Sequence, residues 1–107
     1  MNGFIQVATT FETKSDAEQL GRLLVEKRLC GCVQILGPMT SIFRWRGKIE
    51  QVEEFLCLIK SHEELFAELE RTIKANHPYQ CPQIVALSIK SGSGDYLDWL
   101  RHELKEI

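Results

Sequence analysis

Residues 77–82 carry the residue types that most readily bind a metal ion. They read His-Pro-Tyr-Gln-Cys-Pro, so an imidazole (His77) and a thiol (Cys81) lie four residues apart. Both groups can face one ion, and the two prolines restrict the backbone that carries them. The alternative is a connector that ends a helix, in which His77 bonds a nearby carbonyl. The segment by itself leaves both interpretations open.

A second group of soft ligands is Cys30 and Cys32, which flank Gly31. In an extended segment both thiols would project from one face, and paired thiolates bind ions such as Cu(I) or Zn(II). Structural zinc normally takes four ligands, however, and the chain has no matching second pair. This favours two small apolar side chains buried where a helix passes into a strand.

No motif in the chain demands an enzyme. Serine, histidine and aspartate all occur, but without the nucleophile-elbow pattern. The Ser91–Gly94 loop precedes a helix and could attract an anion, yet Asp95 would repel that anion and no phosphate-binding motif is present. We therefore predict a protein that is not an enzyme.

Length and composition describe one ordinary globular domain spanning residues 1–107. The chain is 44% hydrophobic and 26% charged, with a net charge of −2. These values exclude disorder, and they provide no overall basic field for nucleic acid or an anionic membrane. The sequence predicts no signal peptide and no membrane span, so we expect a cytoplasmic protein whose four cysteines are reduced.

The elements that must position these residues follow from hydrophobic periodicity and turn residues. Strands are expected at Phe4–Ala8, Cys32–Trp45, Ile49–Lys60 and Ile84–Ile89. The two long strands form a hairpin, with a bulge at Gly37–Pro38 and a tight turn at Gly47–Lys48.

Three helices are expected between and after the strands. The first begins at Ser15 with Glu18 as a capping box and stops before Gly31, and the second begins with the pair Ser61 and Glu64. Asp95 is expected to cap the third, whose apolar stripe is Leu97, Leu100, Leu104 and Ile107. The resulting order predicts an α+β, ferredoxin-like βαββαβ fold with an added C-terminal helix.

The long central hairpin predicts an oligomer. A strand of about 14 residues spans ~46 Å, whereas a compact domain of this length is only about 34 Å across. The hairpin should therefore extend beyond its own domain, with Ile42, Phe43 and Trp45 near its tip. Since an isolated two-stranded ribbon is marginal in water, we expect other copies of the chain to cover it.

Three blocks of the sequence resemble the CutA family of divalent-cation tolerance proteins. They are residues 37–50, residues 77–84 and residues 96–100, and they occur in the same order as in that family. The resemblance implies a ferredoxin-like homotrimer whose long hairpins pair between subunits. It also implies a link to copper and other divalent ions and an architecture similar to the PII signalling trimers, in a family with no established enzymatic activity.

The family's copper site would fall on three positions, of which two depart from the pattern. A cysteine and two adjacent histidines are expected, but this chain has Ala8, Asn76 and His77. The metal site therefore carries over only to His77, and Cys81 could substitute for the lost thiol. We expect weak binding of copper or another divalent cation.

Two alternative functions follow from the sequence, and an enzyme with its site at the trimer clefts ranks third and last. The first is a cytoplasmic homotrimer of divalent-metal response, in which Trp45, Tyr79, Cys81 and Trp99 line intersubunit clefts or pack the trimer. The second is a PII-like trimer that binds a small molecule between subunits and signals to a protein partner.

Overall fold

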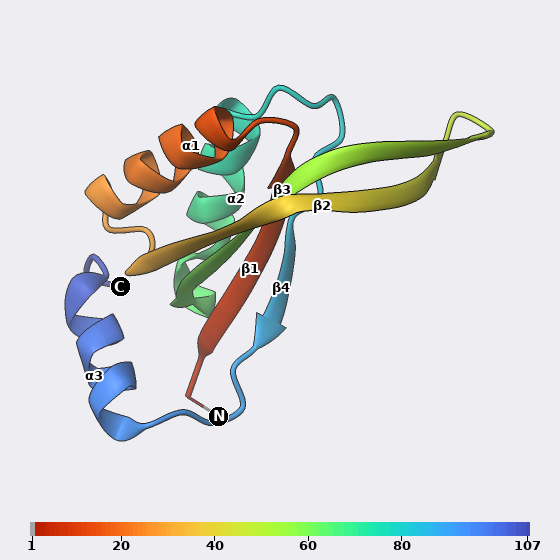
Figure 1. Cartoon of the computed structure of the whole chain (residues 1–107). Helices are drawn as coiled ribbons and strands as arrows, with labels where there is room; N and C mark the ends of the chain where they lie inside the picture. Colours follow the sequence, from red (N-terminus) through yellow and green to blue (C-terminus); the bar gives the residue numbers. More distant parts are fainter. Residues whose placement is uncertain (1) are drawn as a thin grey trace.

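The computed structural model describes residues 2–107, which form a four-stranded antiparallel sheet with α1 and α2 on one of its faces (Figure 1). The elements, in order, are β1 (Phe4–Phe11), α1 (Lys14–Glu26), β2 (Cys32–Trp45), β3 (Lys48–His62), the 3-10 helix η1 (Glu63–Leu65), α2 (Phe66–Ala75), β4 (Val85–Ser88) and α3 (Gly94–Glu103). The strand order is β2-β3-β1-β4. The predicted ferredoxin-like fold with an added C-terminal helix is therefore confirmed.

The main core lies between the sheet and the two helices α1 and α2. Alternate residues of β1 and β3 point into it, and so do the apolar stripes of both helices. Its fully buried large side chains are Val7, Phe11, Leu24, Leu29, Ile59, Leu69 and Ile73. Each contributes about 1.5–3 kcal/mol by leaving water, so this layer supplies most of the folding free energy.

Helix α3 packs on a smaller core that is separate from the main one and lies at the end of the domain away from the β2–β3 hairpin (Figure 1). Leu100 and Leu104 contact Phe4 and Leu65 there. The Arg28 side chain forms two hydrogen bonds to the end of α3. Its Nε donates to the Glu103 carbonyl (2.9 Å), and its Nη2 donates to the His102 carbonyl (2.6 Å). These are the carbonyls that a helix C-terminus leaves without partners, so Arg28 fixes the end of α3.

The opposite face of the sheet is not the one that α1 and α2 cover, and α3 contacts it at its end, at Phe4. Residues paired across antiparallel strands lie on the same face of the sheet. On this face, one row of paired residues consists of Val85, Ala8 and Leu58, and the neighbouring row contains Leu56 and Leu36. Leu36, Val85 and Leu87 are each about half exposed or more (50%, 48% and 63%). We call this apolar surface the open sheet face.

The β2–β3 hairpin extends beyond the rest of the domain (Figure 1). The molecule measures 44 Å along its long axis and only 25 and 22 Å across. The exposed apolar side chains of the extension include Ile42, Phe43, Trp45 and Ile49. The predicted overhang of the hairpin is confirmed for the single chain.

Two irregularities shape this hairpin. The pairing register shifts between Leu36 and Met39, which confirms the bulge expected at Gly37–Pro38. The turn consists of Arg46 and Gly47, both at positive φ (51° and 81°), between the paired residues Trp45 and Lys48. The prediction of Gly47–Lys48 was wrong by one position, because a two-residue turn of this hand needs two consecutive residues at positive φ.

The predicted helix caps were wrong at all three helices. Thr13, and not Ser15, accepts the first-turn hydrogen bond of α1, and Ser93, and not Asp95, does so for α3. In these two helices the capping residue has the extended backbone that a cap requires, and the predicted residue already lies inside the helix.

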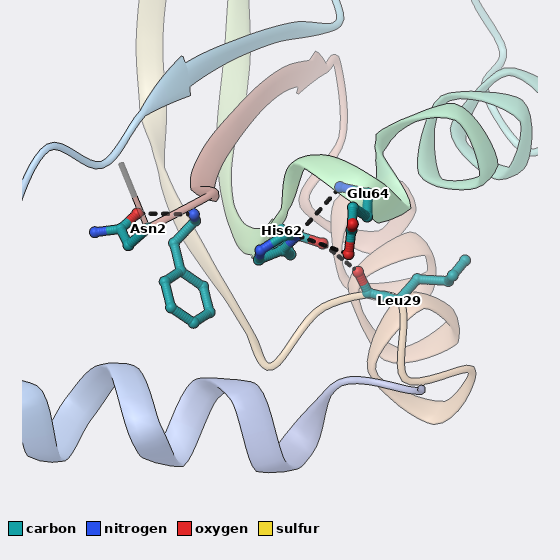
Figure 2. Close-up of polar contacts among 6 residues, drawn as sticks. Asn2, Leu29, His62 and Glu64 are labelled. Carbon is teal, nitrogen blue, oxygen red and sulfur yellow. Dashed lines mark hydrogen bonds and ion pairs between the residues drawn. The ribbon is translucent and has the colours of Figure 1, made fainter. Parts of the chain in front are cut away.

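The third cap is an imidazole. His62 Nδ1 accepts from the Glu64 backbone N–H at the start of η1, and the Ser61 hydroxyl donates to the Leu29 carbonyl (2.7 Å) instead (Figure 2). Ser61 is fully buried, so its hydroxyl needs that internal partner.

Three strands also differ in their bounds from the prediction. Strand β3 is longer at both ends than Ile49–Lys60 and spans Lys48–His62. Strand β1 continues beyond Ala8 to Phe11, because Thr9, Thr10 and Phe11 pair with β3 and are buried. Strand β4 is shorter than Ile84–Ile89 and spans Val85–Ser88. Within residues 2–107, no helix has the length and apolar character needed to cross a membrane.

Candidate functional site

The connector between α2 and β4, residues 76–84, passes the end of β1 at the base of the hairpin (Figure 1). Asn76 ends α2, where its side-chain amide donates to the Thr72 carbonyl (2.9 Å). Pro78 and Pro82 limit the backbone freedom of the residues that follow. The connector thus holds His77 and Tyr79 against the sheet, and Cys81 on the same connector is exposed.

His77 uses both of its ring nitrogens inside the chain. Nε2 lies 2.8 Å from the Thr10 carbonyl, and Nδ1 accepts from the Tyr79 backbone N–H at 3.2 Å. This pattern requires the neutral ring with its proton on Nε2. The ring also stacks on Phe11, with centroids 4.1 Å apart. Burial lowers the pKa of His77, which keeps the ring neutral and in this role.

Tyr79 crosses to the hairpin and contacts Glu54 on β3. Its hydroxyl donates to Glu54 Oε2 at 2.7 Å. Glu54 is only 6% exposed. The pKa of Tyr79 is raised, first by burial and then by the neighbouring Glu54 carboxylate, so the phenol stays protonated and remains the donor.

A cavity of about 410 Å³ lies between the hairpin and the connector. Its apolar walls include Phe43, Trp45 and Tyr79, and Cys81 lies at its edge. An adjoining cavity of about 360 Å³ shares these residues and continues to Thr10 and Gln83. We call the two together the hairpin cavity.

The charges around the hairpin cavity are mostly negative. Glu12, Glu50 and Glu54 line it, against the single guanidinium of Arg46. That guanidinium lies 5.3 Å from the centre of the Trp45 ring and donates to Gln80 Oε1 at 2.9 Å. The site therefore combines aromatic faces with an excess of carboxylates.

The structure brings together three of the four residues expected at a cleft. Trp45, Tyr79 and Cys81 share the hairpin cavity. Trp99 lies on α3 beside Tyr96, with ring centroids 5.6 Å apart, and is 44% exposed on a different part of the surface. Whether Trp99 meets the others across subunits stays a prediction.

Cys30 is buried, which fits the core interpretation, whereas Cys32 is only partly buried, so the prediction of two buried thiols was wrong for Cys32. Burial raises the pKa of Cys30 to about 12. A thiol must lose its proton to bind a metal ion, and this burial opposes that loss. The described cysteines are all free thiols, of which Cys30 and Cys57 are buried.

The residues within one chain fit a multi-ligand metal site poorly. Ala8 supplies no ligand atom, and the Asn76 amide is used at the end of α2. Across residues 2–107, no three histidine, cysteine, aspartate or glutamate side chains come together in a way that could hold an ion. An ion on His77 would have to displace one of its two hydrogen bonds. Metal binding there stays a prediction.

The carboxylates and Arg46 were not among the residues predicted for this site. One signal could have identified Glu54: it alternates with Leu56 and Leu58 along β3, so it belongs to the face of the sheet that carries apolar residues. A carboxylate in that row is expected to have a partner. Glu12 and Arg46 lie in connections and offered no periodic signal.

Comparisons with known proteins point to one family. The model of the CutA1 divalent ion tolerance protein matches residues 5–103. The chain is 43% identical over 95 residues to the divalent-cation tolerance protein CutA of Thermus thermophilus, covering 89% of this chain and 92% of that protein.

Solved structures agree. A divalent cation tolerance protein (Cut A1) from Thermus thermophilus superposes with a TM-score of 0.93 at 40% identity, over 95% of this chain and 99% of that one. The protein CutA from Archaeoglobus fulgidus, described as periplasmic, gives a TM-score of 0.92 at 36% identity, over 95% of this chain and 99% of its own.

Proposed function

The chain belongs to the CutA1 divalent ion tolerance family, and from this premise we propose that it acts in the tolerance of divalent metal ions, binding copper weakly. The match over residues 5–103 carries this proposal. The proposed role is binding and response, not catalysis. The proposed location is the cytoplasm, although the Archaeoglobus relative is described as periplasmic.

The proposed assembly is a homotrimer, supported by two surfaces of the single chain. The open sheet face leaves Leu36, Val85 and Leu87 in contact with water, and the hairpin extends Ile42 and Trp45 beyond the domain. Apolar surfaces of this extent on a small domain are typical of interfaces. A trimer would cover both and would complete the walls of the hairpin cavity.

The proposed copper ligand is His77, in a binding mode that must be weak. The imidazole is the ligand type that copper favours, but its Nδ1 lone pair already accepts from the Tyr79 N–H. Copper binding therefore costs a hydrogen bond, and one imidazole cannot impose a coordination geometry. Cys81, on the same connector, is the proposed second ligand.

Light scattering tests the assembly. The protein should have a mass near three times 12.3 kDa at micromolar concentration. Trp45→Ala should weaken the assembly, because a large aromatic near the hairpin tip is a typical interface anchor. A monodisperse monomer of the parent protein would contradict the proposed trimer.

Calorimetry with Cu(II) tests the proposed copper binding at His77. The parent protein should bind Cu(II) weakly at neutral pH, and His77→Ala should lose most of that binding. His62→Ala and His102→Ala are the matched controls and should retain it, because His62 caps η1 and His102 bonds the Asp98 carbonyl of its own helix. Equal copper binding by His77→Ala and the parent would remove His77 from the proposal.

A second candidate function is a PII-like sensor of a small molecule, and the hairpin cavity favours it. A volume of about 410 Å³ is sufficient for a metabolite-sized ligand. In a trimer this cavity would lie beside a neighbouring subunit, where ligand binding can influence the hairpin. A thermal-shift screen of metabolites distinguishes this candidate from one that responds to metal alone.

A further inference from the structure

Glu54 is a buried carboxylate without a cation. It is 6% exposed, and its one hydrogen bond comes from the neutral phenol of Tyr79. The ion pairs within residues 2–107 join His62 to Glu64, Lys74 to Glu70 and Lys105 to Glu68, and none of them includes Glu54. Buried carboxylates are normally paired with a positive charge, so this one lacks its usual partner.

The surroundings of Glu54 are suited to an organic cation. The carboxylate lines the hairpin cavity together with the aromatic rings of Phe43, Trp45 and Tyr79. The electron-rich faces of aromatic rings attract ammonium and guanidinium groups, and a nearby carboxylate adds a full opposite charge. The guanidinium of the neighbouring Arg46 already lies 5.3 Å from the centre of the Trp45 ring.

The charge balance of the cavity agrees with a positively charged ligand. Glu12, Glu50 and Glu54 outnumber Arg46, so a cation entering the cavity reduces an unfavourable excess of negative charge. An anion would meet three carboxylates. A metal ion is disfavoured, since no three ligating side chains among residues 2–107 converge and hard ions require several oxygen ligands.

We propose that the hairpin cavity binds a small organic cation, an ammonium or guanidinium compound, with Glu54 as its counter-ion and the aromatic walls around it. This inference deepens the second candidate function, the small-molecule sensor. It is independent of the copper ligand, because Glu54 and His77 are separate side chains that can be changed one at a time.

The test compares charged probes with neutral molecules of the same shape. Choline is compared with 3,3-dimethylbutan-1-ol, and methylguanidinium with N-methylurea, by calorimetry on the intact, assembled protein. At least one charged probe should bind tenfold or more tightly than its neutral counterpart. Glu54→Gln should remove that preference, whereas Glu26→Gln, the same change at an exposed end of α1, should not.

A second variant keeps the test decisive if Glu54→Gln does not fold. Tyr79→Phe retains the aromatic wall and frees the Glu54 carboxylate from its hydrogen bond, so it should bind the charged probe at least as tightly as the parent. Any one of three results would overturn the proposal. The first is loss of the preference for the charged probe in Tyr79→Phe, and the second is an unchanged preference in Glu54→Gln. The third is equal binding of charged and neutral probes by the parent.

The alternative to an organic cation is a positively charged side chain from a second copy of the protein, which would pair with Glu54. In that case the parent binds neither charged probe, and Glu54→Gln lowers the mass measured by light scattering. That pair of results would also overturn the proposal. Neither result bears on copper binding, which His77→Ala tests separately.

Discussion

A Cβ atom at Gly31 would lie 2.6 Å from Leu100 Cδ1, so the backbone between β2 and α1 is in direct contact with helix α3. Leu100 is fully buried. The glycine between Cys30 and Cys32 therefore serves the packing of α3.

Gly31→Ala should destabilise the protein by about 1–3 kcal/mol, because the added methyl group overpacks a filled core. Gly94→Ala is the matched control: nothing lies within 4 Å of its added Cβ, and it begins α3. That change should be neutral or stabilising by up to about 1 kcal/mol. Urea unfolding of the two variants measures the difference, and equal stabilities would contradict the packing role of Gly31.

The contact between Gly31 and Leu100 marks the limit of what the sequence could predict. Alternation and leucine spacing are local signals, and they predicted the strands, the helices and the long hairpin. The caps at Thr13, His62 and Ser93 were missed, since several neighbouring residues could cap and only the folded backbone selects one.

The same limit applies to the candidate site. His77, Tyr79 and Cys81 form a local motif, so their shared connector could be recognised. The contact of Tyr79 with Glu54 spans 25 residues, and it depends on how the connector crosses the base of the hairpin. No spacing in the sequence contains that information.

Arg28→Ala should weaken the attachment of α3 to the rest of the domain. The change removes two hydrogen bonds to the carbonyls of His102 and Glu103, where the partial negative charge of a helix end favours a cation. Because Arg28 is exposed, we expect a loss of only about 1 kcal/mol in the free energy of unfolding. Hydrogen exchange should show faster exchange in α3 than in α1.

Arg22→Ala provides the control for Arg28→Ala. Arg22 is an exposed arginine within α1. Its removal should leave the exchange of α3 unchanged. If both variants accelerate exchange in α3 equally, the effect comes from net charge and not from the end of the helix.

The four thiols should differ in reactivity while the protein is folded. Cys81 is exposed, and Cys30 and Cys57 are buried with their pKa values raised to about 12 and about 11. Cys81 should therefore react first with a thiol reagent at pH 8, and Cys30 and Cys57 only on unfolding. Mass spectrometry of the modified peptides gives the order, and early modification of Cys30 would contradict it.

In denaturant without reductant, all four cysteines should react. This part of the prediction concerns the expected reduced state of the thiols. A pair that stays protected after unfolding would indicate a disulfide, and the proposed cytoplasmic location would then lose its support.

The stability of the protein should fall in mild acid because of His77. Burial lowers the pKa of this ring in the folded protein, so below pH of about 6.5 the unfolded chain binds more protons than the folded one. The free energy of unfolding then decreases as the pH falls toward the folded-state pKa. Protonation also places a second N–H on Nδ1, where the Tyr79 N–H already points, and so breaks a hydrogen bond of the connector.

Urea unfolding between pH 7.5 and 5 measures this effect in the parent and in His77→Gln. The variant should be less stable at pH 7.5, since it loses the stack on Phe11, and its stability should depend less steeply on pH. His102→Gln, an exposed histidine of α3, is the control. If it flattens the pH profile as much as His77→Gln does, the acid sensitivity does not come from the connector, and the description of His77 as a ring that must stay neutral is wrong.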